Sequence, residues 1–286
     1  MLVRTPNWLG DCVMSLESIA GILKENAGSA LWCHPRVIEL FSLFFPDTPL
    51  VPLGDRIPPF ERLLLMTSSF RSALLAMRTG IPERTGYSRG IGNTFLTHVV
   101  PFKDDRSRHH SLDYETLAVA VGCTPVPVPH PGPAPGEHLA VFAGARYGSA
   151  KRWNGFPEVI RLLGMPAVFY GTAGEQAELS RVANQCGGRC ETGLSLHDLA
   201  REILSARACV GNDSGGVHLA AALGVPTVAV FCSTSPSWTG PRGSRTRSVV
   251  TRAGCSPCFG RKCANGSWSC TRDISPADVA KAVRNV

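Results

Sequence analysis

The sequence predicts an α/β protein made of two domains, each built around a parallel sheet. Short apolar segments of strand length alternate with helical segments along both halves of the chain. This order is typical of parallel sheets with right-handed crossovers. A proline-rich stretch separates two parts of ordinary domain size. Because 44% of the 286 residues are hydrophobic, the chain can bury a core, which excludes wholesale disorder.

In the first part, the strand signals are short apolar runs. Residues 2–3 end the first expected strand and lead into a loop at 4–10. The amphipathic run 11–24 predicts the first helix. The other elements expected in this part are strands at 31–33 and 62–66 and a helix at 37–45.

The stretch 125–136 reads PVPVPHPGPAPG and holds six prolines in twelve residues. Such a segment forms neither a helix nor a central strand, so we expect a semi-rigid extended linker. The expected organisation is therefore a first domain at 1–124, this linker, and a second domain at 137–272. A C-terminal helix at 273–286 is expected to pack back toward the first domain.

The second part repeats the alternation. Its expected strands are 139–142, 167–170, 208–210 and 227–231, and its expected helices are 156–163, 175–186, 196–206 and 217–223. Ligands of such sheets bind at the carboxyl ends of the strands. We therefore expect a cleft between the carboxyl ends of the two sheets to hold the functional site.

The net charge of +7 comes from 29 Lys and Arg against 22 Asp and Glu. It suggests nucleic acid, an anionic membrane or an anionic substrate as partner. Residues 1–124 carry 12 basic and 12 acidic side chains, whereas residues 242–272 carry seven basic and no acidic ones. A protein that coats nucleic acid spreads its basic residues over several elements. The concentration in one segment argues against that class, and we expect no nucleic-acid partner.

Eleven cysteines are present. The N-terminus shows no signal-peptide pattern and no run reaches the roughly 18 apolar residues of a membrane span, so we expect a cytoplasmic protein with reduced thiols. Four cysteines form a C-x2-C-x4-C-x6-C cluster: Cys255, Cys258, Cys263 and Cys270. The C-x2-C part is a common half-site for structural zinc or an Fe–S cluster. A disulfide and reduced buried thiols remain alternatives.

The segment GNDSGGVH, residues 211–218, follows a predicted strand and begins a predicted helix. Its small residues let backbone N–H groups converge on an anion at the helix N-terminus. Asp213 is suited to accept hydrogen bonds from ligand hydroxyls, and His218 to donate one to a phosphate oxygen. A plain N-cap explains the same residues.

Two further loops follow strands of the second part. In GARYGSAKRW, residues 144–153, the pair Lys151 and Arg152 suits phosphate, although neither the Walker nor the G-x-G-x-x-G spacing is present. A solvated basic loop is the alternative. In GTAGE, Glu175 suits ribose hydroxyls or simply favours the first turn of a helix.

Near the N-terminus, NWLGD ends at Asp11, where the first predicted helix begins. A carboxylate there could act as a general base or as an ordinary N-cap. Together, the four loops offer a base, an anion cradle, a Lys/Arg pair and a ribose-type carboxylate. This combination suits transfer of a sugar from a nucleotide diphosphate.

Three segments carry a family resemblance: LVRTPNWLGDCVMSLESI, GARYGSAKRWNGFPEVI and NDSGGVHLAAALGVPTVAVFCSTSP. They resemble the ADP-heptose:lipopolysaccharide heptosyltransferases of glycosyltransferase family 9, and YGSAKRW and CSPCFGRKC are most similar to heptosyltransferase II. The resemblance implies a GT-B fold, with two Rossmann-like domains facing across a cleft. It also implies inverting transfer of L-glycero-D-manno-heptose from ADP-heptose to the lipopolysaccharide inner core, with no obligatory catalytic metal.

By this resemblance, Asp11 matches the family's proposed catalytic base. The positions that match donor-binding residues are Lys151 at the diphosphate, Glu175 at the ribose, Leu194 at the adenine, Asp213 at the heptose, and Ser214, Gly215 and His218 in the phosphate-binding turn. Gly216 departs from the family pattern, since a larger apolar residue is usual there, and we expect a looser start of the helix. Asn154 stands where proline is common, and the chain is shorter than typical members.

The acceptor side is suggested by residues 71–103, which carry five basic residues and one acid. The loop RTGYSRGIGNTFLTH resembles the family's acceptor-side segment. We expect Arg71, Arg84 and Arg89 to contact the anionic Kdo/heptose–lipid A acceptor by bidentate pairing, with a solvated surface as the alternative. The basic segment 242–272 is then expected to face the membrane or to support the cysteine cluster. The expected location is the cytoplasmic face of the inner membrane, as a peripheral protein.

Three other functions fit parts of the sequence. A sugar-nucleotide 2-epimerase needs a separate set of acids and histidines around the sugar, which we do not find. A GT-B transferase for another nucleotide sugar uses the same loops. A basic, cysteine-rich nucleic-acid-binding protein leaves the two-domain cleft unexplained.

Overall fold

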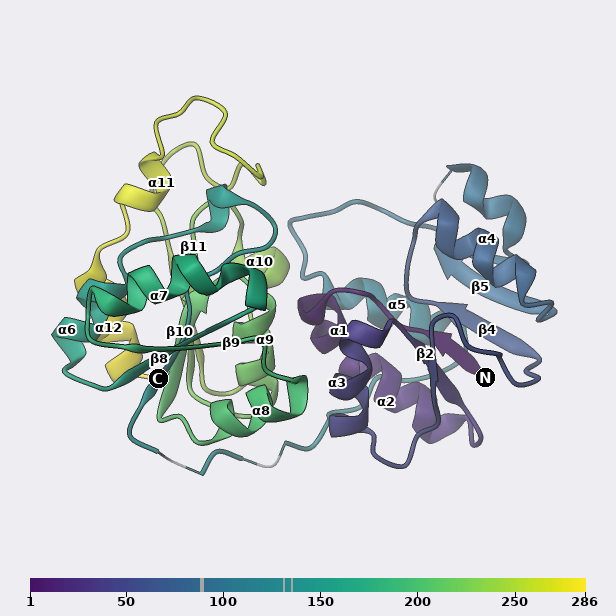
Figure 1. Cartoon of the computed structure of the whole chain (residues 1–286). Coiled ribbons are helices and arrows are strands. Elements are labelled where there is room, and N and C mark those ends of the chain that lie inside the picture. Colours follow the sequence, from purple (N-terminus) through teal and green to yellow (C-terminus); the bar gives the residue numbers. More distant parts are fainter. Residues whose placement is uncertain (88–89, 131, 135) are drawn as a thin grey trace. The chain divides into compact units, whose positions relative to one another are not determined.

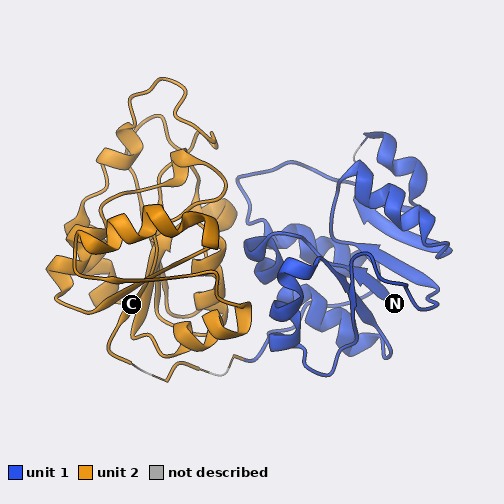
Figure 2. Ribbon diagram, viewed as in Figure 1, with its two compact units in different colours: residues 1–129 blue, residues 130–286 orange. Residues whose placement is uncertain are grey.

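The computed structural model describes the whole chain except residues 88–89, 131 and 135. The chain divides into two compact units, residues 1–129 and 130–286 (Figure 2). The division falls inside the proline-rich stretch. Each unit contains one six-stranded parallel sheet (Figure 1).

The sheet of the first unit has the order β3-β2-β1-β4-β5-β6. Its strands are β1 (Leu2–Arg4), β2 (Ala30–Cys33), β3 (Leu50–Pro52), β4 (Arg62–Leu65), β5 (Glu83–Tyr87) and β6 (His98–Val100). The chain runs outward from β1 to β3 and then returns to pair β4 with β1. The direction of winding therefore reverses between β1 and β4, and the carboxyl end of β1 lies at the crevice where such sheets bind ligands.

The helices of the first unit are α1 (Leu9–Met14), α2 (Leu16–Glu25), α3 (Ile38–Phe44), α4 (Phe70–Arg78) and α5 (Ser111–Ala120), with short 3-10 turns η1 (Pro35–Val37) and η2 (Gly90–Phe95). The single helix expected at 11–24 is in fact two. The chain turns at Ser15, whose hydroxyl donates to the carbonyl of Cys12 at 2.8 Å.

The sheet of the second unit has the order β12-β11-β10-β7-β8-β9. Its strands are β7 (Leu139–Phe142), β8 (Ala167–Gly171), β9 (Arg189–Thr192), β10 (Ala208–Asn212), β11 (Thr227–Phe231) and β12 (Thr246–Val250). Here the winding reverses between β7 and β10, which pair directly. The loops GARYGSAKRW and NDSGG follow these two strands, so both begin at the crevice of this sheet.

The helices of the second unit are α6 (Phe156–Leu163), α7 (Gln176–Asn184), α8 (Leu196–Leu204), α9 (Gly215–Ala222), α10 (Pro236–Thr239), α11 (Ser269–Arg272) and α12 (Pro276–Arg284), with 3-10 turns η3 (Ser149–Lys151) and η4 (Ala173–Glu175). Among the described residues, no helix is long and apolar enough to cross a bilayer.

The C-terminal helix α12 packs within the second unit, and its expected packing toward the first domain stays a prediction. It contacts α6 and strands β10, β11 and β12. Its apolar stripe of Val279, Ala280 and Val283 joins the core formed by that sheet and α6. Burial of this stripe holds the helix on its own unit.

Both ends of the proline-rich stretch are anchored. On the first unit, the N–H groups of Thr124 and Val126 donate to Glu25 and Glu17 of α2. A Cβ at Gly21 of α2 would lie 2.0 Å from the carbonyl oxygen of Thr124, so only glycine fits there. On the second unit, His130 packs against Gly224, which has a positive φ of 79°.

Candidate active site

A buried carboxylate lies at the carboxyl end of β10. Oδ2 of Asp213 accepts hydrogen bonds from Lys151 Nζ at 2.5 Å, Thr234 Oγ1 at 2.7 Å and Thr239 Oγ1 at 3.0 Å. Asp213 is 4% exposed and Lys151 is 7% exposed. The loop after β7 is therefore tied to the loop after β10 by an ion pair shielded from water.

His218 completes this group from the first turn of α9. Its Nε2 lies 3.8 Å from Oδ1 of Asp213, and the ring is buried. Burial by itself raises the pKa of Asp213, but the interaction with His218 and the charge of Lys151 outweigh it and lower that pKa to about 2. Asp213 is thus a carboxylate at neutral pH.

The N-terminus of α9 lies next to this ion pair. Its N-cap, Ser214, has an extended backbone and its hydroxyl makes no capping hydrogen bond. Ser214 and Gly215 are half-buried, in contrast to the buried residues that follow them. The plain N-cap interpretation is therefore not what the structure shows. The positive end of the α9 dipole lies beside a hydroxyl that does not cap it, which suits an anion.

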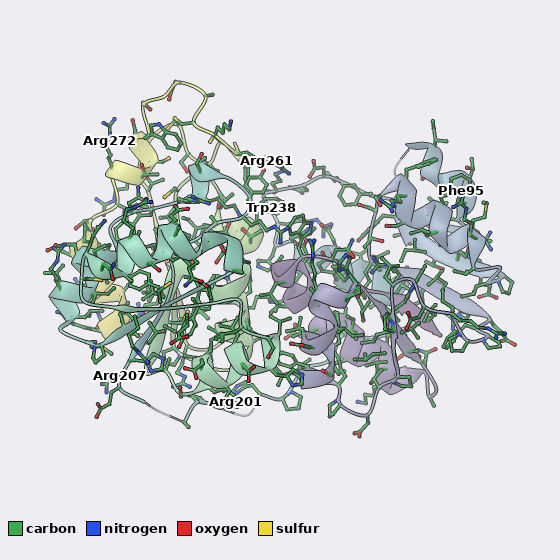
Figure 3. The ribbon with its side chains drawn as sticks, viewed as in Figure 1. Phe95, Arg201, Arg207, Trp238, Arg261 and Arg272 are labelled. Carbon is green, nitrogen blue, oxygen red and sulfur yellow. The ribbon has the colours of Figure 1, made fainter. Side chains whose placement is uncertain are left out.

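Aromatic and basic groups border Lys151. Its Nζ lies 4.9 Å from the ring centroid of Tyr147, and the guanidinium carbon of Arg261 lies 5.2 Å from the same centroid. Arg261 is labelled in Figure 3, as is Trp238, which packs edge-on against Phe259. The Tyr147 hydroxyl donates to the carbonyl of Phe259 at 2.9 Å. The segment after β12 thus supports the loop that carries Lys151.

Glu175 follows β8 and forms a capping box. Its Oε2 accepts hydrogen bonds from the N–H of Thr172 at 2.9 Å and from its hydroxyl at 2.7 Å. Oε2 of Glu175 therefore stabilises the first turn of a helix, which is the alternative role that the sequence analysis gives this residue. A Cβ at Gly144 would lie 2.2 Å from Oε1, so the carboxyl group lies against the start of the GARYGSAKRW loop.

Leu194 lies in the neighbouring loop between β9 and α8 and is half-buried. The N–H of Gly193 donates to the carbonyl of Gly171 at 3.1 Å, and Gly193 has a positive φ of 74°. This bond ties the Leu194 loop to the end of β8, close to the Glu175 turn. The structure thus brings Leu194 and Glu175 to one edge of the sheet.

Asp11 belongs to the first unit and lies in the first turn of α1. The N-cap of this helix is Trp8, so Asp11 is not the N-cap. Its side chain is 31% exposed, and its Oδ1 lies 3.7 Å from Nε2 of His110. The position after β1, at the crevice of the sheet, is consistent with a group that meets a substrate.

Arg4, which the sequence analysis did not single out, holds the loop that leads to Asp11. It is 3% exposed, and its guanidinium donates to the carbonyls of Thr5 at 2.6 Å and Trp32 at 3.2 Å and to Oδ1 of Asn7 at 2.6 Å. Sequence gives no signal for this role, because an arginine at a strand end is usually taken to be solvated.

Comparison with known proteins identifies the family. Residues 57–269 match the sequence profile of glycosyltransferase family 9 (heptosyltransferase), which is more than half of the chain. The chain belongs to glycosyltransferase family 9. It is therefore an enzyme of the glycosyltransferase class, as the sequence predicted.

Relatives of this family 9 member align along almost its full length. The chain is 27% identical to lipopolysaccharide heptosyltransferase 2 of Escherichia coli K12, with 98% of this chain and 96% of the relative covered. It is 31% identical to lipooligosaccharide heptosyltransferase 2 of Haemophilus influenzae, with 87% and 88% covered.

Solved structures confirm the GT-B class of the fold. The E. coli ADP-heptose lipopolysaccharide heptosyltransferase II structure has a TM-score of 0.82 at 23% identity, covering 99% of this chain and 97% of that one. E. coli heptosyltransferase WaaC with ADP has a TM-score of 0.77 at 16% identity, covering 99% and 98%. An iron-containing dodecameric glycosyltransferase, TibC of enterotoxigenic E. coli, has a TM-score of 0.66 at 18% identity, covering 99% and 75%.

Gly216 departs from the usual family 9 pattern, and the structure explains how it is accommodated. A Cβ at Gly216 would lie 2.2 Å from Cδ1 of Phe142, the last residue of β7. The buried ring of Phe142 therefore fills the space beside the start of α9. The expected loosening of this helix is not seen, because a side chain from the neighbouring strand replaces the missing one.

The acceptor-side arginines of this family 9 member differ in their surroundings. Arg71 is exposed on the first turn of α4. Arg84 instead donates to the backbone carbonyls of Phe95 at 2.8 Å, Ile81 at 2.5 Å and Pro82 at 3.1 Å, and Phe95 is labelled in Figure 3. Arg84 thus fixes the turn around β5. Arg89 lies outside the described residues.

The four clustered cysteines are all free thiols. Cys255 and Cys258 are exposed, whereas Cys270 is buried. Burial and the neighbouring thiols Cys255, Cys258 and Cys263 raise the pKa of Cys270, while a hydrogen bond from the backbone N–H of Trp268 lowers that of Cys263. Within the described residues, no group of three or more His, Cys, Asp or Glu side chains is arranged to hold a metal ion.

Basic residues of the segment 242–272 serve the second unit itself. Arg245 donates to the carbonyl of Gly224 at 2.5 Å, and Arg247 donates to that of Asn285 at 3.0 Å. Arg272 donates to the carbonyl of Ser267, within the cysteine-rich loop. Part of the positive charge of this segment is therefore used to fasten loops and the C-terminus.

Proposed function

We propose that this protein is an inverting heptosyltransferase that moves L-glycero-D-manno-heptose from ADP-heptose to the lipopolysaccharide inner core. The observation that carries the proposal is the full-length similarity to relatives named lipopolysaccharide or lipooligosaccharide heptosyltransferase 2. Structural neighbours solved with ADP and with ADP-2-deoxy-2-fluoro heptose support the choice of donor.

The donor site in this proposal lies at the crevice of the second sheet. The N-terminus of α9, with Ser214 and Gly215, receives the diphosphate. Lys151 adds a positive charge to the same place, and His218 and Asp213 hold the turn and meet the heptose. Glu175 binds the ribose through the oxygen that lies over Gly144, and Leu194 borders the adenine.

Asp11 acts as the general base. It takes the proton of the acceptor hydroxyl as that oxygen attacks the anomeric carbon from the face opposite the diphosphate. The charge that develops on the departing ADP is stabilised by the α9 N-terminus and Lys151. Closure of the units excludes water and limits hydrolysis of the donor. No covalent intermediate is part of this scheme.

The acceptor is lipid-linked, so the protein works at the cytoplasmic face of the inner membrane as a peripheral protein. Its α4 offers a surface for this contact. Phe70 and Met77 lie seven positions apart on one side of the helix and are 50% and 40% exposed. Arg71 and Arg78 flank them. Apolar side chains bordered by arginines suit an anionic bilayer surface. Arg71 on the same helix binds acceptor phosphates or carboxylates.

A structural metal at the cysteine cluster is a subsidiary proposal. It is supported by the C-x2-C spacing of Cys255 and Cys258. To test this proposal, zinc and iron are measured in protein purified without an affinity tag. Protein that holds neither metal and melts at the same temperature with or without added metal contradicts the proposal.

The deciding experiment is a transfer assay. Purified protein is mixed with ADP-heptose and a panel of defined inner-core acceptors, and the products are weighed by mass spectrometry. We expect one heptose to be added to one acceptor of the panel, with inverted anomeric configuration and release of ADP. If the protein transfers a sugar only from a different nucleotide sugar, it is instead a GT-B transferase that uses that donor. Thermal stabilisation by RNA or DNA and not by ADP-heptose contradicts the proposal in favour of a nucleic-acid-binding protein.

A further inference from the structure

An ordered chain of side chains leads away from Asp11 inside the first unit. Nδ1 of His110 lies 2.8 Å from Oδ2 of Asp113, and its Nε2 lies 3.7 Å from Oδ1 of Asp11. Asp11 comes from α1, whereas His110 and Asp113 lie at the start of α5, which packs against α1. The imidazole therefore lies between two carboxylates that are 102 residues apart in the sequence.

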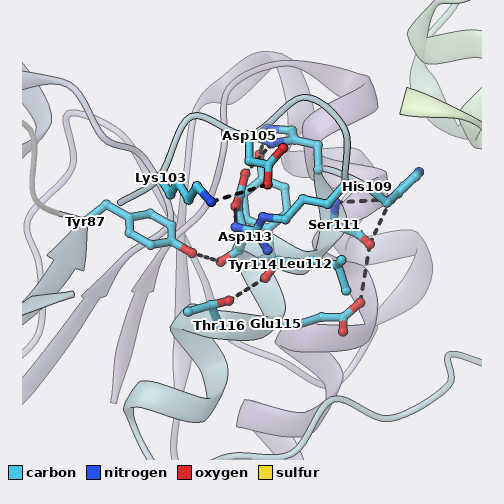
Figure 4. A network of polar contacts seen from close by, with 12 residues as sticks. Tyr87, Lys103, Asp105, His109, Ser111, Leu112, Asp113, Tyr114, Glu115 and Thr116 are labelled. Atoms are coloured by element: carbon cyan, nitrogen blue, oxygen red, sulfur yellow. Dashed lines mark hydrogen bonds and ion pairs between the residues drawn. The ribbon is translucent and has the colours of Figure 1, made fainter. Parts of the chain in front are cut away.

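Asp113 is held firmly in place. It is 7% exposed, and its Oδ1 is paired with the guanidinium of Arg108. Its backbone carbonyl accepts a hydrogen bond from the hydroxyl of Tyr87 on β5, as Figure 4 shows. A carboxylate fixed from both sides in this way can orient the ring that it binds.

The contact with Asp113 also sets the protonation pattern of the ring. Because the carboxylate of Asp113 accepts a hydrogen bond from Nδ1–H, the neutral ring carries its lone pair at Nε2. This nitrogen faces Asp11, and it also lies 3.3 Å from the hydroxyl of the buried Tyr114. The His110 and Tyr114 rings meet edge-on at 5.2 Å, which limits rotation of the imidazole.

A purely local role does not account for the position of His110. It is the N-cap of α5, yet its side chain makes no capping hydrogen bond. Its neighbour His109 does serve locally, with Nδ1 2.9 Å from the hydroxyl of Ser111. The two adjacent histidines thus make different contacts, and Nε2 of His110 lies 3.7 Å from Oδ1 of Asp11.

We propose that His110, oriented by Asp113, is the positioning residue for Asp11 and receives the proton that Asp11 removes from the acceptor. The proposal rests on the role of Asp11 given above. In the transfer, the acceptor O–H bond breaks while the new C–O bond forms and the bond from the anomeric carbon to the diphosphate breaks. The proton passes to Asp11 and then to Nε2 of His110, while ADP leaves with the bonding electron pair.

The arrangement balances charge at each stage. Imidazole is a stronger base than a carboxylate, so transfer to His110 returns Asp11 to its charged form. The imidazolium that results lies between Asp11 and Asp113, and each carboxylate stabilises it. The 3.7 Å separation from Asp11 must shorten during the reaction, as is common for catalytic contacts when the substrate arrives.

The test compares His110→Gln with His109→Gln as a matched control. We expect His110→Gln to lower kcat about 100-fold, at the lower end of the range for a proton-transfer group. The KM values for donor and acceptor should stay near those of the wild type, because in this proposal His110 acts through Asp11 and not on either substrate. His109→Gln should retain wild-type kcat. Equal activity of the two variants overturns the proposal.

Coupling to Asp11 separates this role from a structural one. In an Asp11→Asn background, adding His110→Gln should lower the residual kcat no further, because both act on one proton. An independent, additive loss overturns the proposal. If His110→Gln does not fold, as judged by its thermal melt, Asp113→Asn is used instead, and it should show the same loss of kcat and the same lack of additivity.

The pH profile adds a second readout. The groups that face the imidazole are Asp11 on α1 and Asp113 and Tyr114 on α5, with Arg108 paired to Asp113. Because the proposal gives His110 a part in proton transfer, the dependence of kcat on pH should differ between wild type and His110→Gln. Identical profiles of the two proteins contradict the proposal. Wild-type protein that transfers no heptose to any acceptor disproves the proposed function instead, which keeps the two failures distinct.

Discussion

At the residue scale, the contact that most clearly changes the interpretation of the sequence is the pair of Lys151 and Asp213. The motifs that contain them predict two groups that reach out to a ligand. In the structure they meet each other at 2.5 Å in a buried place. Two charges taken out of water stabilise the fold only while both are present.

Replacing Asp213 by Asn should therefore leave Lys151 buried without its partner charge. We expect a loss of about 3–5 kcal/mol in the free energy of unfolding, measured by urea denaturation. The control is Glu178→Gln, which breaks the Arg152–Glu178 pair of 2.7 Å at the surface. This variant should lose less than about 1 kcal/mol. Equal losses in the two variants would show that the buried pair contributes no more to stability than the surface pair.

The lowered pKa of Asp213 makes a second prediction at this scale. Folding lowers this pKa from 3.8 to about 2, so the stabilisation is fully present above about pH 4 and is lost as the pH falls through 2. A lowering of this size corresponds to roughly 2 kcal/mol. Urea titrations at pH 5, 4 and 3 should show the stability gap between wild type and Asp213→Asn narrowing toward acid. A difference in unfolding free energy that grows toward acid pH contradicts the lowered pKa of Asp213.

At the element scale, the packing of α9 on β7 decides which residues fit. Phe142 ends β7, and Gly216 lies in the first turn of α9. A Cβ on Gly216 enters the Phe142 ring at 2.2 Å. The bulky strand residue and the small helix residue therefore complement each other, so the identity of one depends on the other.

Gly216→Ala should cost about 1–3 kcal/mol in unfolding free energy because of overpacking. Combining it with Phe142→Leu should recover part of that cost, which a double-mutant cycle measures. Gly254→Ala is a suitable control, since nothing lies within 4 Å of a Cβ at that exposed position. Strict additivity of the two substitutions would show that the ring and the glycine do not compete for space.

The individual strands and helices show which parts of the fold the sequence analysis predicted and why it missed others. The apolar runs at β7 and β11 predicted both strands with their observed bounds. Strand β6 was missed because two of its three residues are exposed, and β5, ERTGY, because it has no continuous apolar run. Helix α5 was missed because its apolar residues show hardly any one-sided pattern.

For the candidate site, the sequence analysis singled out residues but did not predict their contacts. The sequence analysis singled out four residues because each comes soon after a predicted strand: Asp11, Lys151, Glu175 and Asp213. Their contacts were not predicted, since Lys151 and Asp213 are 62 residues apart and spacing does not reveal burial. His110 was missed because only the packing of α5 against α1 brings it near Asp11.

At the scale of the whole molecule, the proposed base and the proposed donor site belong to different units. Asp11→Ala should therefore lower kcat by about 100-fold or more while leaving ADP binding within about twofold of the wild type, as measured by calorimetry. Ser214→Pro, which alters the N-cap of α9, should weaken ADP binding instead. Near-normal turnover of the Asp11 variant would remove Asp11 as the base.

The membrane surface is also a property of the whole molecule. The double variant Phe70→Ser and Met77→Ser should co-sediment less with vesicles that contain phosphatidylglycerol, because two exposed apolar anchors are lost. Val119→Ser removes a side chain that is 63% exposed on α5 and serves as control. Sedimentation of the double variant at the wild-type level would place the membrane contact elsewhere.

The anchoring of the proline-rich stretch has a consequence for motion. Its first residues are bound to α2 as far as Val126, and His130 packs against Gly224 of the second unit. The connection between these anchors consists of residues 127–129, which read Pro-Val-Pro. Proline rings fix φ at both ends of this tripeptide. The tripeptide between the two anchors therefore keeps few freely rotating backbone torsion angles, because the φ angles of Pro127 and Pro129 are fixed.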